Sequence, residues 1–113
     1  MSYEPDNEIQ QISTTGPERK LGIDDERELR FCGVLCRNYW EGINALTNMG
    51  PWDVLYLDHD LSSYHDGCEF TGYDIMCFLE ENTHLLPKKI ELVTANPAGR
   101  KRMEMIIKKL YGE

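Results

Sequence analysis

Residues 52–61 read Trp-Asp-Val-Leu-Tyr-Leu-Asp-His-Asp-Leu, and this stretch decides the fold. Its first part, Trp52–Leu57, is mostly apolar and alternates poorly, which predicts a strand that is covered on both faces. The strand is followed directly by Asp58, His59 and Asp60. In a parallel sheet, ligands bind at the carboxyl ends of the strands. The stretch therefore predicts a parallel sheet with carboxylates at its ligand-binding edge.

Strands and helices alternate along the rest of the chain. Short apolar runs predict the strands, and capping residues followed by a helical apolar period predict the helices. The predicted strands are Lys20–Ile23, Phe31–Cys36, Trp52–Leu57 and Lys89–Thr94; helices are expected after Asn38, Thr71 and Asn96; and Ser62–Phe70 is expected to be a loop. This order implies right-handed crossovers and an α/β domain with a short, mainly parallel four-stranded sheet.

The length of 113 residues, with 41% hydrophobic and 28% charged residues, fits a single globular domain. Residues 1–17 are polar and end in Gly-Pro, so we expect a flexible N-terminal arm before one domain over residues 18–113. The first 16 residues lack the apolar core of a signal peptide, and the apolar runs are too short to span a membrane. We therefore expect a cytoplasmic protein with no membrane partner.

The net charge of −8 limits the class of partner. An acidic surface repels polyanions, so we do not expect binding to duplex DNA. A small phosphorylated ligand that binds together with a divalent cation is compatible with this charge. The four cysteines show no CxxC spacing, which predicts free thiols in a reducing compartment. The alternative is a soft-metal site at Cys68, which shares a polar segment with His65 and Asp66.

Acidic residues follow two of the predicted strands. Asp24 and Asp25 end the first strand, and Asp58 ends the third. If these strands are neighbours, the three carboxylates meet at one edge and offer the hard oxygen ligands that Mg²⁺ (or Mn²⁺) prefers. The alternative is that acids at strand ends cap helices or face solvent. We favour a metal site, because two acidic groups share the edge with a helix start suited to an anion.

That helix start is the segment Thr94-Ala95-Asn96-Pro97-Ala98-Gly99-Arg100. The hydroxyl of Thr94 can reach a phosphate oxygen, and Asn96 caps the helix. Gly99 lets a ligand approach the backbone, where free N–H groups and the helix dipole favour an anion. Arg100 can add a bidentate contact to phosphate. The segment therefore predicts a phosphate-binding site, and the alternative is an ordinary Asn-Pro helix start with solvated basic residues.

Three residues near the acids are candidates for the catalytic chemistry. His59 is of a residue type that can act as a general acid or base, or it is a packed or exposed residue that holds Asp58 or Asp60 in place. Asp60 points to the same side as Asp58 or turns outward. Arg27 orients the acids, contacts the substrate, or forms a salt bridge within its loop.

These motifs resemble the cyclic-phosphate processing receiver domains, a compact receiver-like family. Four segments carry the resemblance in the family's order: Asp24-Asp25-x-Arg27, Leu57–Leu61, Thr71–Asp74 and Val93–Met103. The resemblance implies a receiver-like (flavodoxin-like) three-layer sandwich. This sandwich is truncated relative to a full receiver, because the strand that carries the essential lysine of receivers is missing and little room is left for their first helix.

The resemblance implies a metal-dependent hydrolase, a phosphoesterase acting on the cyclic phosphate of a nucleotide or of an RNA end. The chain departs from the family pattern at Val93, which stands in place of histidine and cannot transfer a proton, and at Arg102, which stands in place of asparagine. One alternative is a noncatalytic receiver-like module that binds a phosphorylated ligand or a partner protein. A phosphoaccepting receiver with Asp58 as acceptor is a further alternative. A free sheet edge would also favour a homo-oligomer.

Overall fold

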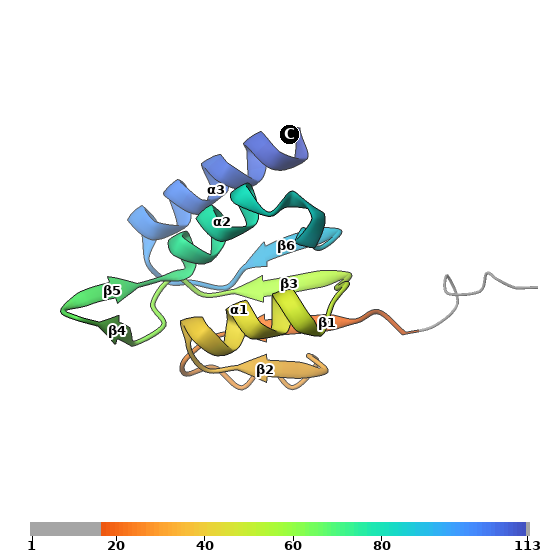
Figure 1. Cartoon of the computed structure of the whole chain (residues 1–113), viewed down its shortest axis with the longest axis horizontal. Coiled ribbons are helices and arrows are strands. Elements are labelled where there is room, and N and C mark those ends of the chain that lie inside the picture. The colour runs from red at the N-terminus through yellow and green to blue at the C-terminus, as the bar shows by residue number, and fades with distance from the viewer. Residues whose placement is uncertain (1–16, 113) are drawn as a thin grey trace, which may run out of the picture.

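The computed structural model describes residues 17–112, so the predicted arm lies, apart from Pro17, outside the described residues. The strands and helices are β1 (Lys20–Ile23), β2 (Val34–Cys36), α1 (Tyr39–Asn48), β3 (Val54–Leu57), β4 (Ser63–His65), β5 (Cys68–Phe70), α2 (Gly72–Glu81), the short 3-10 turn η3 (Thr83–Leu85), β6 (Lys89–Leu92) and α3 (Pro97–Tyr111) (Figure 1). None of the helices in this part of the chain is both long enough and apolar enough to cross a bilayer.

The main sheet has the strand order β2-β1-β3-β6, and all neighbouring strands are parallel. This arrangement confirms the predicted four-stranded parallel sheet and the receiver-like α/β fold. The apolar strand β3 lies inside the sheet between β1 and β6, as its composition predicts. Because all four strands run in one direction, the segments that follow β1, β3 and β6 meet at a single edge (Figure 1).

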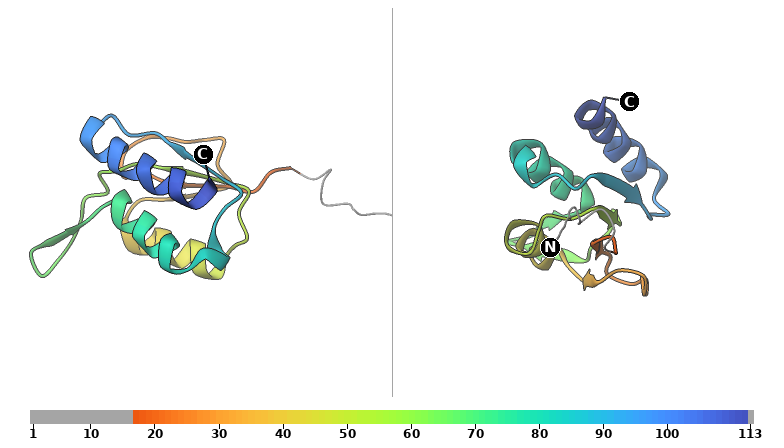
Figure 2. Two further views of the ribbon diagram at one scale, coloured as in Figure 1. Left: turned by 90° about the horizontal axis from the view of Figure 1, so that it is seen from above. Right: turned by 90° about the vertical axis from the view of Figure 1, so that its right-hand side faces the viewer.

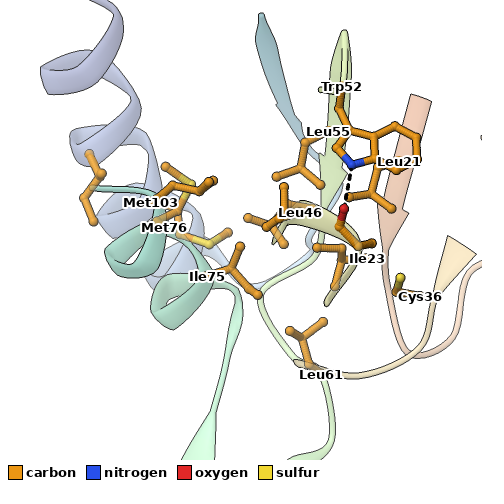
Figure 3. Close-up of a cluster of buried hydrophobic side chains, with 14 residues drawn as sticks. Leu21, Ile23, Cys36, Leu46, Trp52, Leu55, Leu61, Ile75, Met76 and Met103 are labelled. Carbon is orange, nitrogen blue, oxygen red and sulfur yellow. Dashed lines mark hydrogen bonds between the residues drawn. The ribbon is translucent and has the colours of Figure 1, made fainter. Parts of the chain in front are cut away.

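The helices lie side by side on one face of the sheet, with α2 between α1 and α3 (Figure 2). Helix α1 approaches the sheet closely at Gly42, where a Cβ atom would lie 2.7 Å from Cδ1 of Ile23. Leu46 of α1 lies at the centre of the apolar core, between the strands and α2 (Figure 3). The Trp52 indole N–H donates to the Ala45 carbonyl at 3.0 Å and fixes the last turn of α1 to the start of β3.

The opposite face of the sheet is covered by the irregular segment of residues 24–33 in place of a helix. Gly22 faces this layer, and Cδ1 of Leu29 lies 3.1 Å from the position that a Cβ atom would take. The rings of Phe31 and Tyr56 meet edge to face, with their centroids 4.7 Å apart. This short covering layer agrees with the little room that the sequence leaves for the first helix of a full receiver.

Two segments differ from the sequence prediction. Strand β2 begins at Val34, because Phe31 and its neighbours belong to the layer that covers the sheet. The loop predicted for Ser62–Phe70 is wrong, since β4 and β5 form an antiparallel hairpin there. Its turn is made by Asp66 and Gly67, whose φ angles of 51° and 78° suit a two-residue hairpin turn of the primed type.

Candidate metal and phosphate site

Three carboxylates meet at the carboxyl edge of the sheet. Asp24 and Asp25 follow β1, and Asp58 follows the neighbouring strand β3. One oxygen from each of the three side chains lies within 4.8 Å of the other two. Asp24 is fully buried, Asp58 is 5% exposed and Asp25 is half-buried. The structure therefore brings together the three acids that the sequence predicts as metal ligands.

The polypeptide fixes one oxygen of each acid. Oδ1 of Asp24 accepts two N–H groups of the following loop, at 2.9 and 2.8 Å. Oδ1 of Asp58 accepts the N–H of His59 at 2.8 Å. Oδ2 of Asp25 accepts the hydroxyl of Ser62 at 2.6 Å. The second oxygen of each carboxylate lies outside these bonds, so the acids are held in a fixed direction and still offer ligand atoms.

Arg27 is the counter-charge of this cluster. Its Nη1 lies 3.1 Å from Oδ2 of Asp24 and 3.5 Å from Oδ2 of Asp58. The hydrogen bond to Asp24 is the main cause that raises the pKa of Arg27. Burial, followed by the charge of Asp24, raises the pKa of Asp58 against the opposing effects of the His59 N–H, the Thr94 hydroxyl and Arg27. One guanidinium facing three carboxylates leaves an excess of negative charge.

The donor set fits a hard divalent cation. Mg²⁺ binds carboxylate oxygens at 2.0–2.1 Å in octahedral geometry, so oxygens on opposite sides of the ion lie about 4.2 Å apart. The spread of up to 4.8 Å among the ligand atoms of Asp24, Asp25 and Asp58 is close to this value. The excess negative charge would also favour a cation. These three acids are therefore the residues that would hold Mg²⁺ or Mn²⁺.

Thr94 lies beside the acids, two residues beyond the end of β6. It is 6% exposed, and its hydroxyl is among the groups that lower the pKa of the nearby Asp58 carboxyl. The same oxygen accepts the N–H of Asn96 at 3.0 Å. Thr94 therefore joins the start of α3 to the acid cluster. Its contact with a phosphate oxygen stays a prediction.

The start of α3 differs in detail from the expectation. Asn96 caps the helix, as predicted, by accepting the N–H of Gly99 at 3.0 Å. This N–H is therefore not free for a phosphate. Gly99 also faces the ring of His59, and a Cβ atom at this position would lie 2.4 Å from Cδ2 of the ring. The space that the sequence suggested for a ligand at Gly99 is filled by His59.

The guanidinium of Arg100 bonds the β6 edge of the sheet. Its Nη2 donates to the carbonyl of Leu92 at 3.0 Å and lies 3.4 Å from that of Thr94. The N–H of Val93 donates to Leu57 of β3, so the carbonyls of the residues on either side point away from the sheet. Arg100 thus occupies the place where a further strand would pair. Its contact with phosphate stays a prediction.

His59 is buried, and Asp60 turns outward. His59 is 7% exposed, and its Nδ1 lies 2.9 Å from Oδ1 of Asp60 and 3.4 Å from Nδ2 of Asn96. Among the described residues, Nε2 of His59 is buried without a hydrogen-bond partner. The side chain of Asp60 is 60% exposed. His59 therefore has the position of the packed residue that holds Asp60, and Asp60 is the carboxylate that solvent or a ligand can reach.

Two residues of the site were missed from the sequence. Ser62 bonds Asp25, and its place directly after the Leu57–Leu61 motif was a signal that could have identified it. Arg37 donates to the carbonyls of Asp24 and Arg27 at 3.1 and 2.8 Å and so holds the loop after β1. No local sequence pattern indicates this role of Arg37.

The chain was also compared with known proteins. A family model described as "Cyclic-phosphate processing Receiver domain" matches residues 19–109. Comparison with curated proteins and with solved structures found no match. The family match includes the three acids, Arg27, and the whole segment from Thr94 to Arg100. The chain belongs to the family of cyclic-phosphate processing receiver domains.

Proposed function

We propose that this protein is a divalent-metal-dependent phosphoesterase that hydrolyses the cyclic phosphate of a nucleotide or of an RNA end. The observation that carries the proposal is the cluster of Asp24, Asp25 and Asp58, whose ligand oxygens lie within 4.8 Å of one another. The membership of the chain in a cyclic-phosphate processing family supports the substrate class. An acidic cluster with no metal would repel such a substrate, so binding requires the cation.

In this proposal, the three acids hold Mg²⁺ or Mn²⁺, which when bound neutralises phosphate charge and lowers the pKa of a water molecule. The Thr94 hydroxyl contacts a nonbridging oxygen and stabilises the charge that develops on it. In the reaction, the water oxygen forms a bond to phosphorus, one of the two ester P–O bonds of the ring breaks, and the ester oxygen that leaves takes up the proton lost by the water. The product is a phosphomonoester.

Asp60 is the residue that we propose to accept the proton of the attacking water. Its carboxylate is exposed and oriented by Nδ1 of His59, whereas His59 itself is buried. Arg27 contacts the phosphate through the N–H groups that do not face Asp24 and Asp58. These roles assign Asp60 and Arg27 to catalysis and His59 to positioning.

The second candidate function is a noncatalytic module that binds a phosphorylated ligand. Two observations favour it: Val93 carries no proton-transfer group, and Nε2 of His59 is enclosed by the protein. This candidate requires the same metal site and the same phosphate contacts. It differs from the first only in the absence of turnover.

The experiment that tests both candidates is an assay of nucleoside 2′,3′-cyclic phosphates and of cyclic mono- and oligonucleotides with Mg²⁺ or Mn²⁺. The variant is Asp58→Asn, and the matched control is Asp66→Asn, which changes an exposed acid at the tip of the hairpin. Hydrolysis that is lost only in Asp58→Asn supports the enzyme. Metal binding by calorimetry without hydrolysis supports the module, and failure to bind any divalent ion contradicts both.

A further inference from the structure

The hairpin β4–β5 stands at the border of the candidate site. It projects beyond the arrowheads of β2, β3 and β6, at the edge where the acids lie (Figure 1). Two hydrogen bonds fix its base. Oγ of Ser63 accepts the N–H of Tyr39 at 2.9 Å, and Oγ of Ser62 donates to Oδ2 of Asp25 at 2.6 Å. The base of the hairpin therefore lies between the start of α1 and the acid cluster.

One face of the hairpin is packed against α1. Ser63 pairs with Phe70, and the ring of Phe70 lies 4.9 Å from that of Tyr39 and 5.7 Å from that of Trp40, measured between centroids. Ser63 is 1% exposed. These contacts account for the aromatic residues on this face, because they anchor the hairpin to the first turn of α1.

The other face presents an aromatic ring that packing does not account for. Tyr64 pairs with Glu69, and strand alternation turns both side chains away from the face of the hairpin that packs on α1. Tyr64 is 63% exposed. Its backbone lies two residues beyond Ser62, which bonds Asp25, and two residues span at most about 7 Å. A phosphate bound at the acid cluster would therefore lie near Tyr64, and the ring would be within reach of the base of the same nucleotide.

Exposed aromatic rings beside a phosphate site bind bases by stacking, which is favourable for any base because each has a π face. We propose that Tyr64 stacks on the nucleobase of a ligand whose cyclic phosphate lies at the acid cluster. This inference rests on the proposed function and narrows its substrate class to base-bearing cyclic phosphates. The net charge of −8 and Glu69 on the same face favour a mononucleotide over a long RNA.

The test compares two ligands and three variants in the presence of Mg²⁺. The ligands are a nucleoside 2′,3′-cyclic phosphate and the base-free ribose 2,3-cyclic phosphate, and the variants are Tyr64→Ala, Tyr64→Phe and Met105→Ala. Tyr64→Ala is expected to weaken binding of the nucleotide about tenfold. The same variant leaves binding of the base-free ligand unchanged, because that ligand has nothing to stack. Tyr64→Phe keeps the ring and retains affinity. Met105→Ala removes an exposed apolar side chain from α3, outside the contacts that anchor the hairpin, and has no effect.

Several outcomes would overturn the inference and leave the proposed function standing. One is wild-type protein that binds both ligands with equal affinity. Others are a Tyr64→Ala variant that loses affinity for both ligands equally, or an equal loss of nucleotide affinity in Met105→Ala. Wild-type protein that binds Mg²⁺ but neither ligand contradicts the proposed function itself. Circular dichroism of each variant separates a loss of binding from a loss of fold.

Discussion

The imidazole ring of His59 occupies the space that a side chain at position 99 would fill. A Cβ atom on Gly99 would lie 2.4 Å from Cδ2 and 2.5 Å from Cγ of this ring. His59 follows β3, and Gly99 lies in the first turn of α3. The contact therefore sets how closely the start of α3 approaches the end of β3. This distance in turn places Thr94 against Asp58.

We predict that Gly99→Ala destabilises the fold by about 1–3 kcal/mol through overpacking against His59. At an ordinary helix position the same change would be favourable by about 1 kcal/mol, so the sign of the effect is diagnostic. Urea unfolding measures the free energy. The matched control is Gly33→Ala, where the atom nearest to the new Cβ is the Lys20 carbonyl oxygen at 3.8 Å.

A double-mutant cycle makes the prediction more specific. In the His59→Ala background the ring is absent, so Gly99→Ala should cost much less than in the wild type. A Gly99→Ala variant that is more stable than the wild type would contradict the close contact.

We predict that Asp58→Asn stabilises the protein in the absence of divalent cations. Burial and the charge of Asp24 raise the pKa of Asp58, so folding disfavours its charged form. The charged Asp58 carboxylate therefore lowers the free energy of unfolding of the wild type. This loss is absent below the ordinary aspartate pKa. It develops as the pH rises through the raised folded-state pKa and persists at neutral pH. The gain in melting temperature of Asp58→Asn should therefore be present at pH 7 and disappear in acid.

Addition of Mg²⁺ should make the wild type more stable than Asp58→Asn. A bound cation stabilises the folded wild type by mass action, and the variant lacks one of its ligands. The control is Asp53→Asn at the opposite end of β3, because a hydrogen bond from the Arg19 N–H lowers the pKa of Asp53. This second variant should lose stability at neutral pH. If Asp58→Asn also loses stability without metal, the carboxylate is not under electrostatic strain.

Much of this arrangement could be predicted because its causes are local. The helix caps Asn38, Thr71 and Asn96 each bond to backbone a few residues away, so their side chains mark the helix starts in the sequence itself. The clustering of Asp24 and Asp58 follows from a rule of topology, since parallel neighbours bring their carboxyl ends together. The hairpin was also encoded locally, by Asp66-Gly67, and the loop prediction overlooked this signal.

The rest depends on contacts between distant segments. The packing of His59 on Gly99 joins residues far apart in the chain, and neither residue type indicates the other. The position of Arg100 depends on β6 being an edge strand of the described sheet, which is a property of the assembled strands. Its charge and its place in a helix start suggested a phosphate ligand. Only the arrangement of β6 identifies the carbonyls that it bonds.

We predict that Arg27→Met strengthens Mg²⁺ binding while it weakens binding of a cyclic phosphate. Nη1 of Arg27 lies near one oxygen each of Asp24 and Asp58, so the guanidinium competes with a cation for these two atoms. Its removal leaves the cluster more negative. Calorimetric titration with Mg²⁺ alone, and then with a nucleoside 2′,3′-cyclic phosphate, separates the two effects.

The matched control for this prediction is Arg30→Met, which removes an exposed charge from the same segment. It should change neither affinity. Weaker Mg²⁺ binding in Arg27→Met would show that the guanidinium supports the metal site by orienting Asp24, and it would contradict the competition.

The last prediction concerns the β6 edge of the sheet. Nη2 of Arg100 bonds the carbonyls of Leu92 and Thr94, which would otherwise be open to pairing with a strand of another molecule. We predict that Arg100→Met lowers the free energy of unfolding by about 1.5–3 kcal/mol, the usual contribution of a hydrogen bond to a charged group. It should also promote self-association, measured by light scattering over a range of concentrations. Lys101→Met removes the same charge from an exposed site on α3 and should do neither. If Arg100→Met stays as stable and as monomeric as Lys101→Met, the guanidinium does not protect the edge. The phosphate contact predicted from the sequence would then be the better explanation for Arg100.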